Sequence, residues 1–278
     1  MKLTLAERLM RKTTIQYAWL KSKCTHGFHT QFAGESVTFC EGSVISLGSA
    51  SLPKHSHRNR IVRDADWIQQ MAVTAWLEAN PTAKTFVDVG AFHGYYAISI
   101  GKHLAKRGGK VVAVEPDPKN FELLVQSVAM NGLEETVHCV DVGCSDHDGE
   151  MFFQPKSAQG SLSDTKGEDG IPVRIATLDS ILGTLGITEP IDCLMVDVEG
   201  AELPVMQGCN PERIANAELF IELHPYAWKD MGYTAADLEA YLLEHNRICV
   251  DMFHRVHQRF EADPWFPNYI GPTKWIQR

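Results

Sequence analysis

The 278-residue sequence lacks the features that would place it in a membrane or in a secretory pathway. It has no run of about 18 apolar residues, the length that a membrane-spanning helix needs. Charged side chains interrupt residues 1–16, so no apolar signal-peptide core forms there. The sequence also has no internal repeat and no low-complexity tract. We therefore expect a globular, cytoplasmic protein with no membrane span.

The cysteines lack the number and spacing of a disulfide framework or a zinc site. There are seven of them, which is an odd number, and no two form a C-x-x-C pair. Several lie in apolar, strand-like runs such as VHCVDV and IDCLMVDV. We interpret them as small buried hydrophobic residues of a protein in a reducing compartment.

An excess of basic residues is also missing, since the formal net charge is -9. A general nucleic-acid-binding surface requires a positive field, so we expect a small-molecule partner and no nucleic acid. One local segment, residues 54–63, is basic. It either closes over an acceptor and binds a carboxylate or phosphate on it, or forms a solvated linker.

Two parts of the sequence differ in pattern. Residues 1–63 form an N-terminal extension, with a helix expected over 1–20, a β hairpin or meander over 27–48, and a candidate role as a cap over the acceptor. Residues 64–278 begin with a helical pattern and then alternate strand and helix patterns. Near-continuous apolar strands joined by helices predict an α/β fold, with a parallel sheet covered on both faces.

The alternation is interrupted over residues 150–176. The strand-like segments EMFFQP and IPVRIATL flank a loop rich in glycine, serine and aspartate, residues 157–170. This pattern predicts an inserted hairpin. Its loop is either a lid over the acceptor or an insertion without a role in function.

A carboxylate and two glycines occupy the turn after the first strand of the expected sheet. The segment TFVDVGAFHGYYA places Asp88, Gly90 and Gly94 there. Ligands of such sheets bind at the carboxyl ends of the strands, and glycine leaves room for a ligand near the backbone. A purely structural tight turn is the alternative. The next strand ends at Glu115, which is either a partner for both hydroxyls of a ribose or a solvated glutamate.

Two nucleoside cofactors fit a glycine turn followed by an acidic residue. The dinucleotide fingerprint G-x-G-x-x-G has a glycine where this sequence has Asp88. A carboxylate there repels a pyrophosphate, but it suits the positively charged amino group and sulfonium of S-adenosylmethionine. We therefore predict S-adenosylmethionine, with an NAD-dependent Rossmann oxidoreductase as the alternative.

Several motifs resemble those of the FkbM-type S-adenosylmethionine-dependent methyltransferases. VDVGAFHGYYA, AVEPDPKNFELL, TLDSIL, VDVEGAELPVMQG and IELHP occur in the order and spacing of that family, over about residues 64 to 250. The resemblance implies a class I methyltransferase fold, whose seven-stranded, mostly parallel sheet has an antiparallel last strand and helices on both faces. It also implies O-methylation, usually of a sugar or related natural-product hydroxyl. Met195 departs from the pattern, because the family often has a lysine before the aspartate of DVEG.

The resemblance also implies where the donor binds. The methionine end of the donor is expected near Asp88, Gly90, Ala91 and Gly94. The ribose is expected at Glu115, and the adenine near Asp141 or Ser145. Phe92 and Tyr95 either flank the donor or pack in the core. The full set of predicted cofactor-binding residues is Asp88, Gly90, Ala91, Phe92, Gly94, Tyr95, Glu115, Asp141 and Ser145.

Two later strands end in VDVEG and IELHP and bring four reactive side chains to the same sheet edge. These predicted catalytic residues are Asp197, Glu199, Glu222 and His224. An alcohol acceptor must lose its proton, which His224 takes with Asp197 nearby. Alternatively, a divalent metal held by Asp197, Glu222 and His224 lowers the pKa of the hydroxyl. Glu199 and Glu202 have a further reading as acidic residues that stabilise a helix N-terminus.

The sequence therefore predicts an S-adenosylmethionine-dependent O-methyltransferase. Its expected acceptor is a hydroxyl of a small polar molecule, such as a sugar, a glycan or a natural-product moiety. A catalytically silent domain that binds the methyl donor is the alternative outside the enzymes.

Overall fold

The computed structural model describes residues 76–155 and 160–247 and the single residue Val73. It also describes three short strands before this range and two after it. The helix expected over residues 1–20 and the basic segment at 54–63 lie outside the described residues. Of the helix expected to start at residue 64, the structure describes Val73 and residues 76–79, all of which are helical. None of the described helices combines the length and apolar character needed to cross a bilayer.

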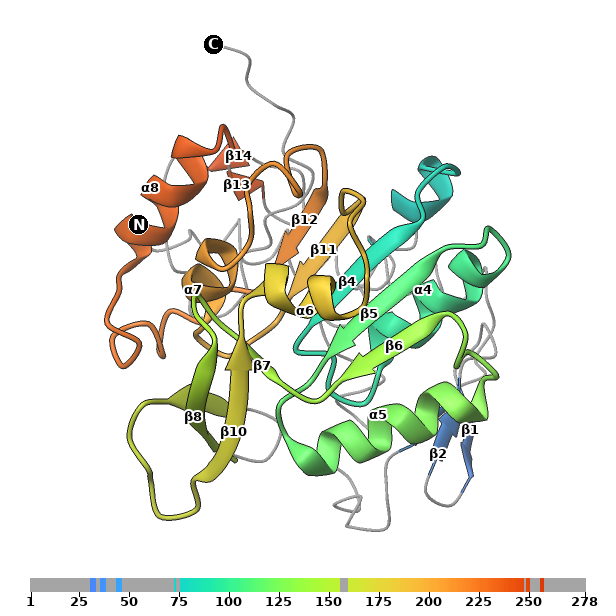
Figure 1. Ribbon diagram of the computed structural model, residues 1–278, viewed down its shortest axis with the longest axis horizontal. Helices are drawn as coiled ribbons and strands as arrows, with labels where there is room; N and C mark the ends of the chain where they lie inside the picture. The colour runs from blue at the N-terminus through green and yellow to red at the C-terminus, as the bar shows by residue number, and fades with distance from the viewer. Residues whose placement is uncertain are drawn as a thin grey trace, which may run out of the picture.

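A five-stranded sheet forms the centre of the described chain (Figure 1). Its strands lie in the order β12 (Glu218–Ile221), β11 (Cys193–Val196), β4 (Thr85–Val89), β5 (Lys110–Val114) and β6 (Val137–Val140), and all neighbours are parallel. The chain reverses direction along the sheet between β4 and β11, which is where ligands bind in such folds. The predicted α/β class is confirmed.

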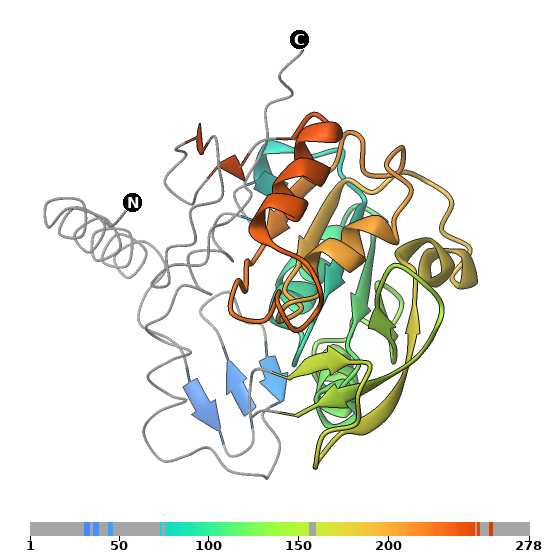
Figure 2. The same ribbon diagram turned by 90° about the vertical axis from the view of Figure 1, so that its left-hand side faces the viewer.

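The expected count of seven strands is not reproduced among the described residues. The two strands near the C-terminus, β13 (Cys249–Val250) and β14 (Val256–His257), pair with each other in an antiparallel sheet of their own. The meander expected over residues 27–48 is confirmed by β1 (Gln31–Ala33), β2 (Ser36–Thr38) and β3 (Val44–Ser46), which pair in antiparallel order and appear in blue in Figure 2.

Helices cover both faces of the parallel sheet. On one face lie α4 (Tyr95–Ala105) and α5 (Pro118–Met130); on the other lie α6 (Leu178–Thr184), α7 (Glu202–Gln207) and α8 (Ala235–Glu244). Asp117 caps α5 by accepting hydrogen bonds from the backbone N–H groups of Lys119 and Asn120, and Pro118 takes the first helical position.

Alternation along the strands decides which face each side chain joins. Val87 and Val89 of β4 pack in the apolar cluster that contains α6, α7 and α8, whereas Phe86 packs in the cluster that contains α4 and α5. Asp88, two residues after Phe86, therefore points toward α4. Of the described cysteine side chains, Cys144, Cys193 and Cys209 are buried as predicted, whereas Cys139 is only partly buried; all four are free of disulfides.

The predicted insertion is present as a second, smaller sheet. Its strands are β8 (Gly149–Gln154), β9 (Ser161–Ser163) and β10 (Ile171–Ala176), which pair in antiparallel fashion, with β7 (Gly143–Cys144) parallel to β10. Figure 1 shows this sheet projecting from the carboxyl edge of the parallel sheet, beyond β7. The inserted hairpin is therefore confirmed.

Candidate active site

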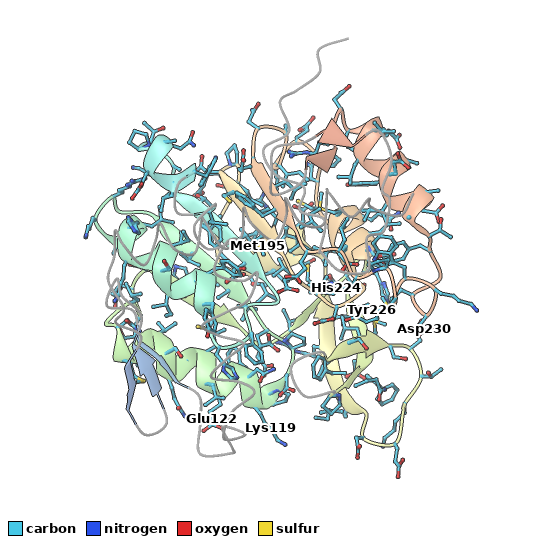
Figure 3. The ribbon with its side chains drawn as sticks, turned by 180° about the vertical axis from the view of Figure 1, so that it is seen from behind. Lys119, Glu122, Met195, His224, Tyr226 and Asp230 are labelled. Carbon is cyan, nitrogen blue, oxygen red and sulfur yellow. The ribbon has the colours of Figure 1, made fainter. Side chains whose placement is uncertain are left out.

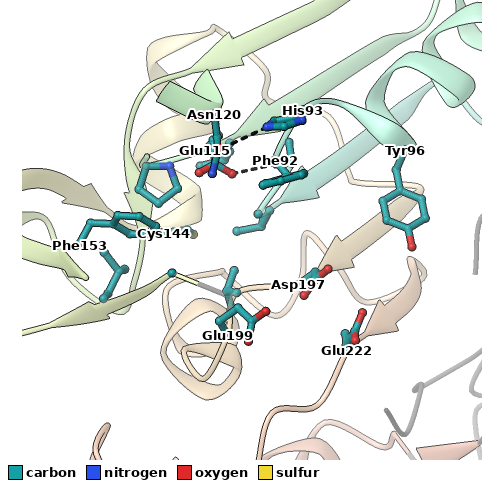
Figure 4. Close-up of a pocket in the computed structure, with 18 of the residues that line it drawn as sticks. Phe92, His93, Tyr96, Glu115, Asn120, Cys144, Phe153, Asp197, Glu199 and Glu222 are labelled. Atoms are coloured by element: carbon teal, nitrogen blue, oxygen red, sulfur yellow. Dashed lines mark hydrogen bonds between the residues drawn. The ribbon is translucent and has the colours of Figure 1, made fainter. Parts of the chain in front are cut away.

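A cavity opens at the carboxyl ends of β4, β5, β11 and β12 (Figure 4). At one end its wall contains Phe92, Glu115 and Asn120. At the other end it contains Asp197, Glu199 and Glu222, which come from the segments after β11 and β12. Of the predicted cofactor-binding residues, the wall includes Gly90, Ala91, Phe92, Tyr95 and Glu115.

Gly90 is required by the neighbouring backbone rather than by a ligand. Its φ is +88°, and a Cβ atom there would lie 1.7 Å from the carbonyl oxygen of Asp197. Gly94, with φ of +92°, precedes α4, and a Cβ there would lie 2.8 Å from Leu124 Cδ1. The expectation that both glycines leave room for a ligand is therefore corrected: the space is filled by the protein itself.

Asp88 lies behind the cavity wall. Its side chain is fully buried, and Oδ2 accepts a hydrogen bond from the backbone N–H of Ala97 at 3.1 Å. Oδ1 is buried and has no hydrogen-bond partner among the described residues. Its neighbour in register on β11 is Met195, which is also fully buried. The side chain of Asp88 therefore does not reach the cavity wall, because strand alternation turns it toward α4.

Burial governs the charge of this carboxyl group. It raises the pKa of Asp88 to about 7; the Ala97 hydrogen bond opposes the rise and the nearby Glu115 adds to it. Met195 stands where the resembling family often carries a lysine, so no ammonium group faces Asp88 across the strands.

Asp88 is expected to make folding stability depend on pH. Its pKa is about 7 in the folded chain and lies near its ordinary value of 3.8 in the unfolded chain. Between these values only the folded chain holds the proton, so stability is full at low pH and falls as the pH rises. We expect Asp88 to contribute a loss of about 3 kcal/mol between about pH 4 and pH 7. Urea unfolding of the wild type and of Asp88→Asn at both pH values measures this contribution. It equals the loss of unfolding free energy in the wild type minus the loss in the variant.

Two further variants check the cause. Met195→Lys is expected to place an ammonium group opposite the carboxylate and so also to weaken the pH dependence. Asp141→Asn removes an exposed carboxylate and should leave the dependence as in the wild type. If Asp88→Asn kept the whole wild-type dependence, the assignment to Asp88 would be wrong.

Glu115 joins the two turns that border the cavity. Its Oε2 accepts a hydrogen bond from the backbone N–H of Phe92 at 2.8 Å, and its Oε1 accepts one from that of Asp117 at 2.9 Å. Burial raises the pKa of Glu115 to about 7, although both backbone hydrogen bonds oppose this. Phe92 has a φ of +50°, a left-handed conformation that this bond helps to hold. A carboxylate has further lone pairs, so its predicted role at the ribose stays open as a prediction.

The sequence reasoning missed part of the wall near Glu115. Nε2 of His93 lies 3.2 Å from Asn120 Oδ1. The His93 ring stacks on Phe92, with the ring centroids 3.7 Å apart. Figure 4 shows these side chains together at one end of the cavity. The position of Asn120 in the first turn of α5 was the available signal, because that turn begins at the same sheet edge.

The expected adenine residues are not on the cavity wall. Asp141 is exposed, and Ser145 is buried with its hydroxyl donating to Asp146 at 3.2 Å. Cys144, Phe153 and Leu162 form this wall instead. Phe153 and Leu162 belong to the inserted hairpin, and Figure 4 shows Phe153 beside Cys144 and away from Glu222. Within the loop at 157–170, residues 157–159 lie outside the described residues, whereas Gly160 and Leu162 line the cavity.

His224 lies just behind the second end of the cavity and faces three carboxylates. Its Nε2 is 3.6 Å from Asp197 Oδ1, 3.5 Å from Glu199 Oε2 and 3.8 Å from Glu222 Oε1. The structure thus brings the four predicted catalytic residues together. Asp197, Glu199 and His224 each offer an atom within 4.8 Å of the others, a set that can hold a metal ion. In that set Glu199 replaces the predicted Glu222.

Glu202 orients His224 from inside the protein. It is fully buried, and its Oε1 lies 2.7 Å from His224 Nδ1. Its Oε2 accepts a hydrogen bond from Trp228 Nε1 at 2.8 Å and lies 2.8 Å from the Tyr233 hydroxyl. Sequence reasoning left Glu202 as a helix-terminus residue. The side chains that contact it, those of His224, Trp228 and Tyr233, are 22 to 31 positions away along the chain, so no local pattern indicated them.

These contacts shift the pKa values of Glu202 and His224. Burial by itself would raise the pKa of Glu202, but the hydrogen bond from His224 and that from Tyr233 bring the pKa below its usual value. Burial would lower the pKa of His224, but Glu202, Asp197 and Glu199 together raise it to about 9. The cluster therefore attracts a positive charge at Nε2.

Tyr226 contacts both Glu199 and His224 near this end of the cavity. The hydroxyl of Tyr226 donates a hydrogen bond to Glu199 Oε2, and its ring meets that of His224 edge to face with centroids 5.8 Å apart. Figure 3 shows both side chains on the segment after β12. Glu199 has a φ of +50°, a strained conformation that the following Gly200 and the Tyr226 contact help to maintain.

The comparisons with known proteins concern the same part of the chain. A family model described as the methyltransferase FkbM domain matches residues 88–249, which is more than half of the sequence. No curated protein sequence matches the chain.

Two solved structures illustrate the similarity to known folds. The methyltransferase FkbM from Methylobacillus flagellatus is 19% identical with a TM-score of 0.41, over 59% of this chain and 37% of that one. The O-methyltransferase from Bacillus cereus, solved with SAH, is 15% identical with a TM-score of 0.37, over 63% of this chain and 60% of that one. The chain thus spans less than two thirds of the length of either protein.

Proposed function

Because the chain belongs to the FkbM methyltransferase domain family, we propose that it transfers the methyl group of S-adenosylmethionine to a hydroxyl oxygen of a small polar acceptor. One observation carries this proposal. A single cavity has Glu115 and Phe92 at one end and Asp197, Glu199 and Glu222 at the other. The first end suits a nucleoside, and the second suits a positively charged donor and a hydroxyl acceptor.

The donor is proposed to lie along the cavity from the inserted hairpin toward β11. Its adenine packs against Cys144 and Phe153, and its ribose hydroxyls donate to Glu115. Its methionine end passes Gly90 and Ala91, which line the cavity between its two ends. The carboxylates beyond stabilise the positive sulfonium and amino groups.

The reaction needs alignment and the removal of one proton. A lone pair of the acceptor oxygen forms the new O–CH3 bond, while the S–CH3 bond breaks and its electron pair stays on sulfur, which leaves S-adenosylhomocysteine. The hydroxyl proton passes to the carboxylate–histidine cluster. Because Glu222 and Asp197 lie on the cavity wall and His224 lies behind them, we assign proton acceptance to a wall carboxylate, with His224 holding it in place. An acceptor rich in hydroxyls, such as a sugar, has hydrogen-bond donors for the remaining carboxylates.

Calorimetric titration with S-adenosylmethionine, S-adenosylhomocysteine and NAD tests the donor assignment. We expect the first two to bind and NAD not to bind. Glu115→Gln should weaken donor binding at least about tenfold, a loss of about 1.4 kcal/mol, because an amide cannot accept two backbone hydrogen bonds and the ribose hydroxyls together. Glu122→Gln, an exposed change on α5, is the matched control and should bind as the wild type does.

The alternatives give different results in the same experiment. Binding of NAD alone would support a Rossmann oxidoreductase and would contradict the proposal. Binding of the donor without transfer of a labelled methyl group to any of a panel of sugars and other polyols would support a silent donor-binding domain.

A further inference from the structure

The distances around His224 Nε2 do not match those of a simple ion pair. A charged hydrogen bond between an imidazolium and a carboxylate measures about 2.7 to 2.9 Å. Here Asp197, Glu199 and Glu222 all lie between 3.5 and 3.8 Å from Nε2. Two donor atoms that each lie about 2.1 Å from one metal ion are separated by about 3 to 4 Å. The observed spacing therefore matches the ligand-to-ligand distances around a metal ion.

Nε2 of His224 is aimed at this space by a buried partner. Glu202 is fully buried and lies 2.7 Å from Nδ1, which fixes the proton on that nitrogen. Within residues 76–155 and 160–247, Nε2 makes no hydrogen bond, and the side chain is only 8% exposed. A carboxylate that orients a histidine in this way is a regular feature of metal sites, where it also makes the other ring nitrogen a better ligand.

The three carboxylates also converge, and the described residues that line the cavity include no lysine or arginine. Like charges this close repel one another, and the buried surroundings strengthen the repulsion. Figure 4 shows Asp197, Glu199 and Glu222 at the same end of the cavity, which is open to a ligand. The convergence of the three carboxylates and the aim of Nε2 toward them both fit a bound cation.

We propose that Asp197, Glu199 and His224 bind a divalent cation at the acceptor end of the cavity. Two oxygen ligands and one imidazole suit an ion that accepts both, so Mn²⁺ fits better than Ca²⁺, which takes only oxygen. Glu222, 3.8 Å from Nε2, stays beside the ion and not in its ligand set. Three protein ligands leave open positions for the acceptor.

The role of the ion rests on the proposed function, whereas its binding does not. Bound to the ion, an acceptor hydroxyl loses its proton more readily, and a second adjacent oxygen of the acceptor completes a chelate. The proton passes to Glu222, and the oxygen takes the methyl group as described above. The acceptor class is therefore a molecule with two neighbouring oxygen atoms, such as a vicinal diol of a sugar.

Titration of the full chain with Mn²⁺ alone tests the site. The free ion is followed by electron paramagnetic resonance, and the heat by calorimetry, without donor or acceptor. We expect one Mn²⁺ per chain. Asp197→Asn and Glu199→Gln should each weaken binding at least about tenfold, and so should Glu202→Gln, which acts through the orientation of His224. Asp230→Asn is the matched control, because this exposed carboxylate lies in the segment after β12 but outside the cluster (Figure 3).

Two results would overturn the proposal. One is no binding at up to about 1 mM Mn²⁺, the weak end of carboxylate sites. The other is binding that Asp197→Asn, a change at a partly exposed side chain, leaves as strong as in the wild type or in Asp230→Asn. Circular dichroism confirms that each variant is folded. Binding of S-adenosylmethionine without binding of Mn²⁺ would contradict only this inference. Binding of Mn²⁺ without binding of the donor would contradict only the proposed function.

Discussion

Gly90→Ala is expected to lower the free energy of unfolding by more than about 4 kcal/mol, enough to leave much of the protein unfolded. A Cβ at this position would lie 1.7 Å from the carbonyl oxygen of Asp197 and 2.7 Å from its carbonyl carbon. These are backbone atoms, so no side-chain rotation relieves the overlap. The turn after β4 and the end of β11 would have to separate, which would open the sheet where the site is built.

Gly108→Ala is a control that separates the cost of the steric overlap at Gly90 from the cost of a left-handed backbone conformation. Gly108 also has a positive φ, +63°, but an added Cβ there meets nothing within 4 Å. Its replacement should cost only about 1 to 2 kcal/mol, the penalty of a left-handed conformation. Urea unfolding followed by circular dichroism compares the two. Similar losses in both variants would show that the approach of Gly90 to Asp197 does not matter for stability.

Glu202→Leu is expected to have an effect of similar size, about 3 to 5 kcal/mol, for an electrostatic reason. The variant leaves the imidazole of His224 without its buried anion and removes the acceptor of Trp228 Nε1. The Tyr233 hydroxyl also loses one of its partners. An unpaired buried donor costs about 1 to 3 kcal/mol, and a buried charge costs more.

Glu202→Gln tests whether the charge of the side chain is needed, because glutamine keeps nearly the same shape without the charge. The groups around both carboxylate oxygens are hydrogen-bond donors, including the backbone N–H of Gly200 and of His224. The NH2 group of glutamine would therefore face another donor in either orientation, so glutamine should recover little of the loss. Glu122→Leu, at an exposed position of α5, is the control and should change stability by less than about 0.5 kcal/mol. If glutamine restored wild-type stability, the charge of Glu202 would not be what holds His224.

Much of the local structure followed from the sequence. The apolar, β-branched runs form the parallel strands, because strands buried on both faces need such residues on both sides. Asp117 and Pro118 start α5, and the change in pattern over residues 150–176 is an inserted hairpin. The motifs at Asp88, at Asp197 and at His224 also indicated the family, since their order along the chain is itself the signal.

The site was predictable only where a residue's position along a strand fixes its place. Asp197, Glu199, Glu222 and His224 follow strands β11 and β12, and the carboxyl ends of parallel neighbours meet at one edge, so the sequence brought these residues together. The position of Asp88 along its strand also fixes its place, but that place is away from the cavity. It lies within β4, on the face that α4 covers, and therefore points into the protein.

The tertiary structure alone decided the contacts between distant segments. The need for glycine at position 90 comes from the carbonyl of Asp197, and the wall at Cys144 is completed by Phe153 of the hairpin. The orientation of His224 comes from Glu202, which Trp228 and Tyr233 hold in turn. Each of these depends on the register and packing of elements that are far apart along the chain. The sequence by itself thus determined the fold class and the residue types at the sheet edge, whereas packing determined which of their atoms face the cavity.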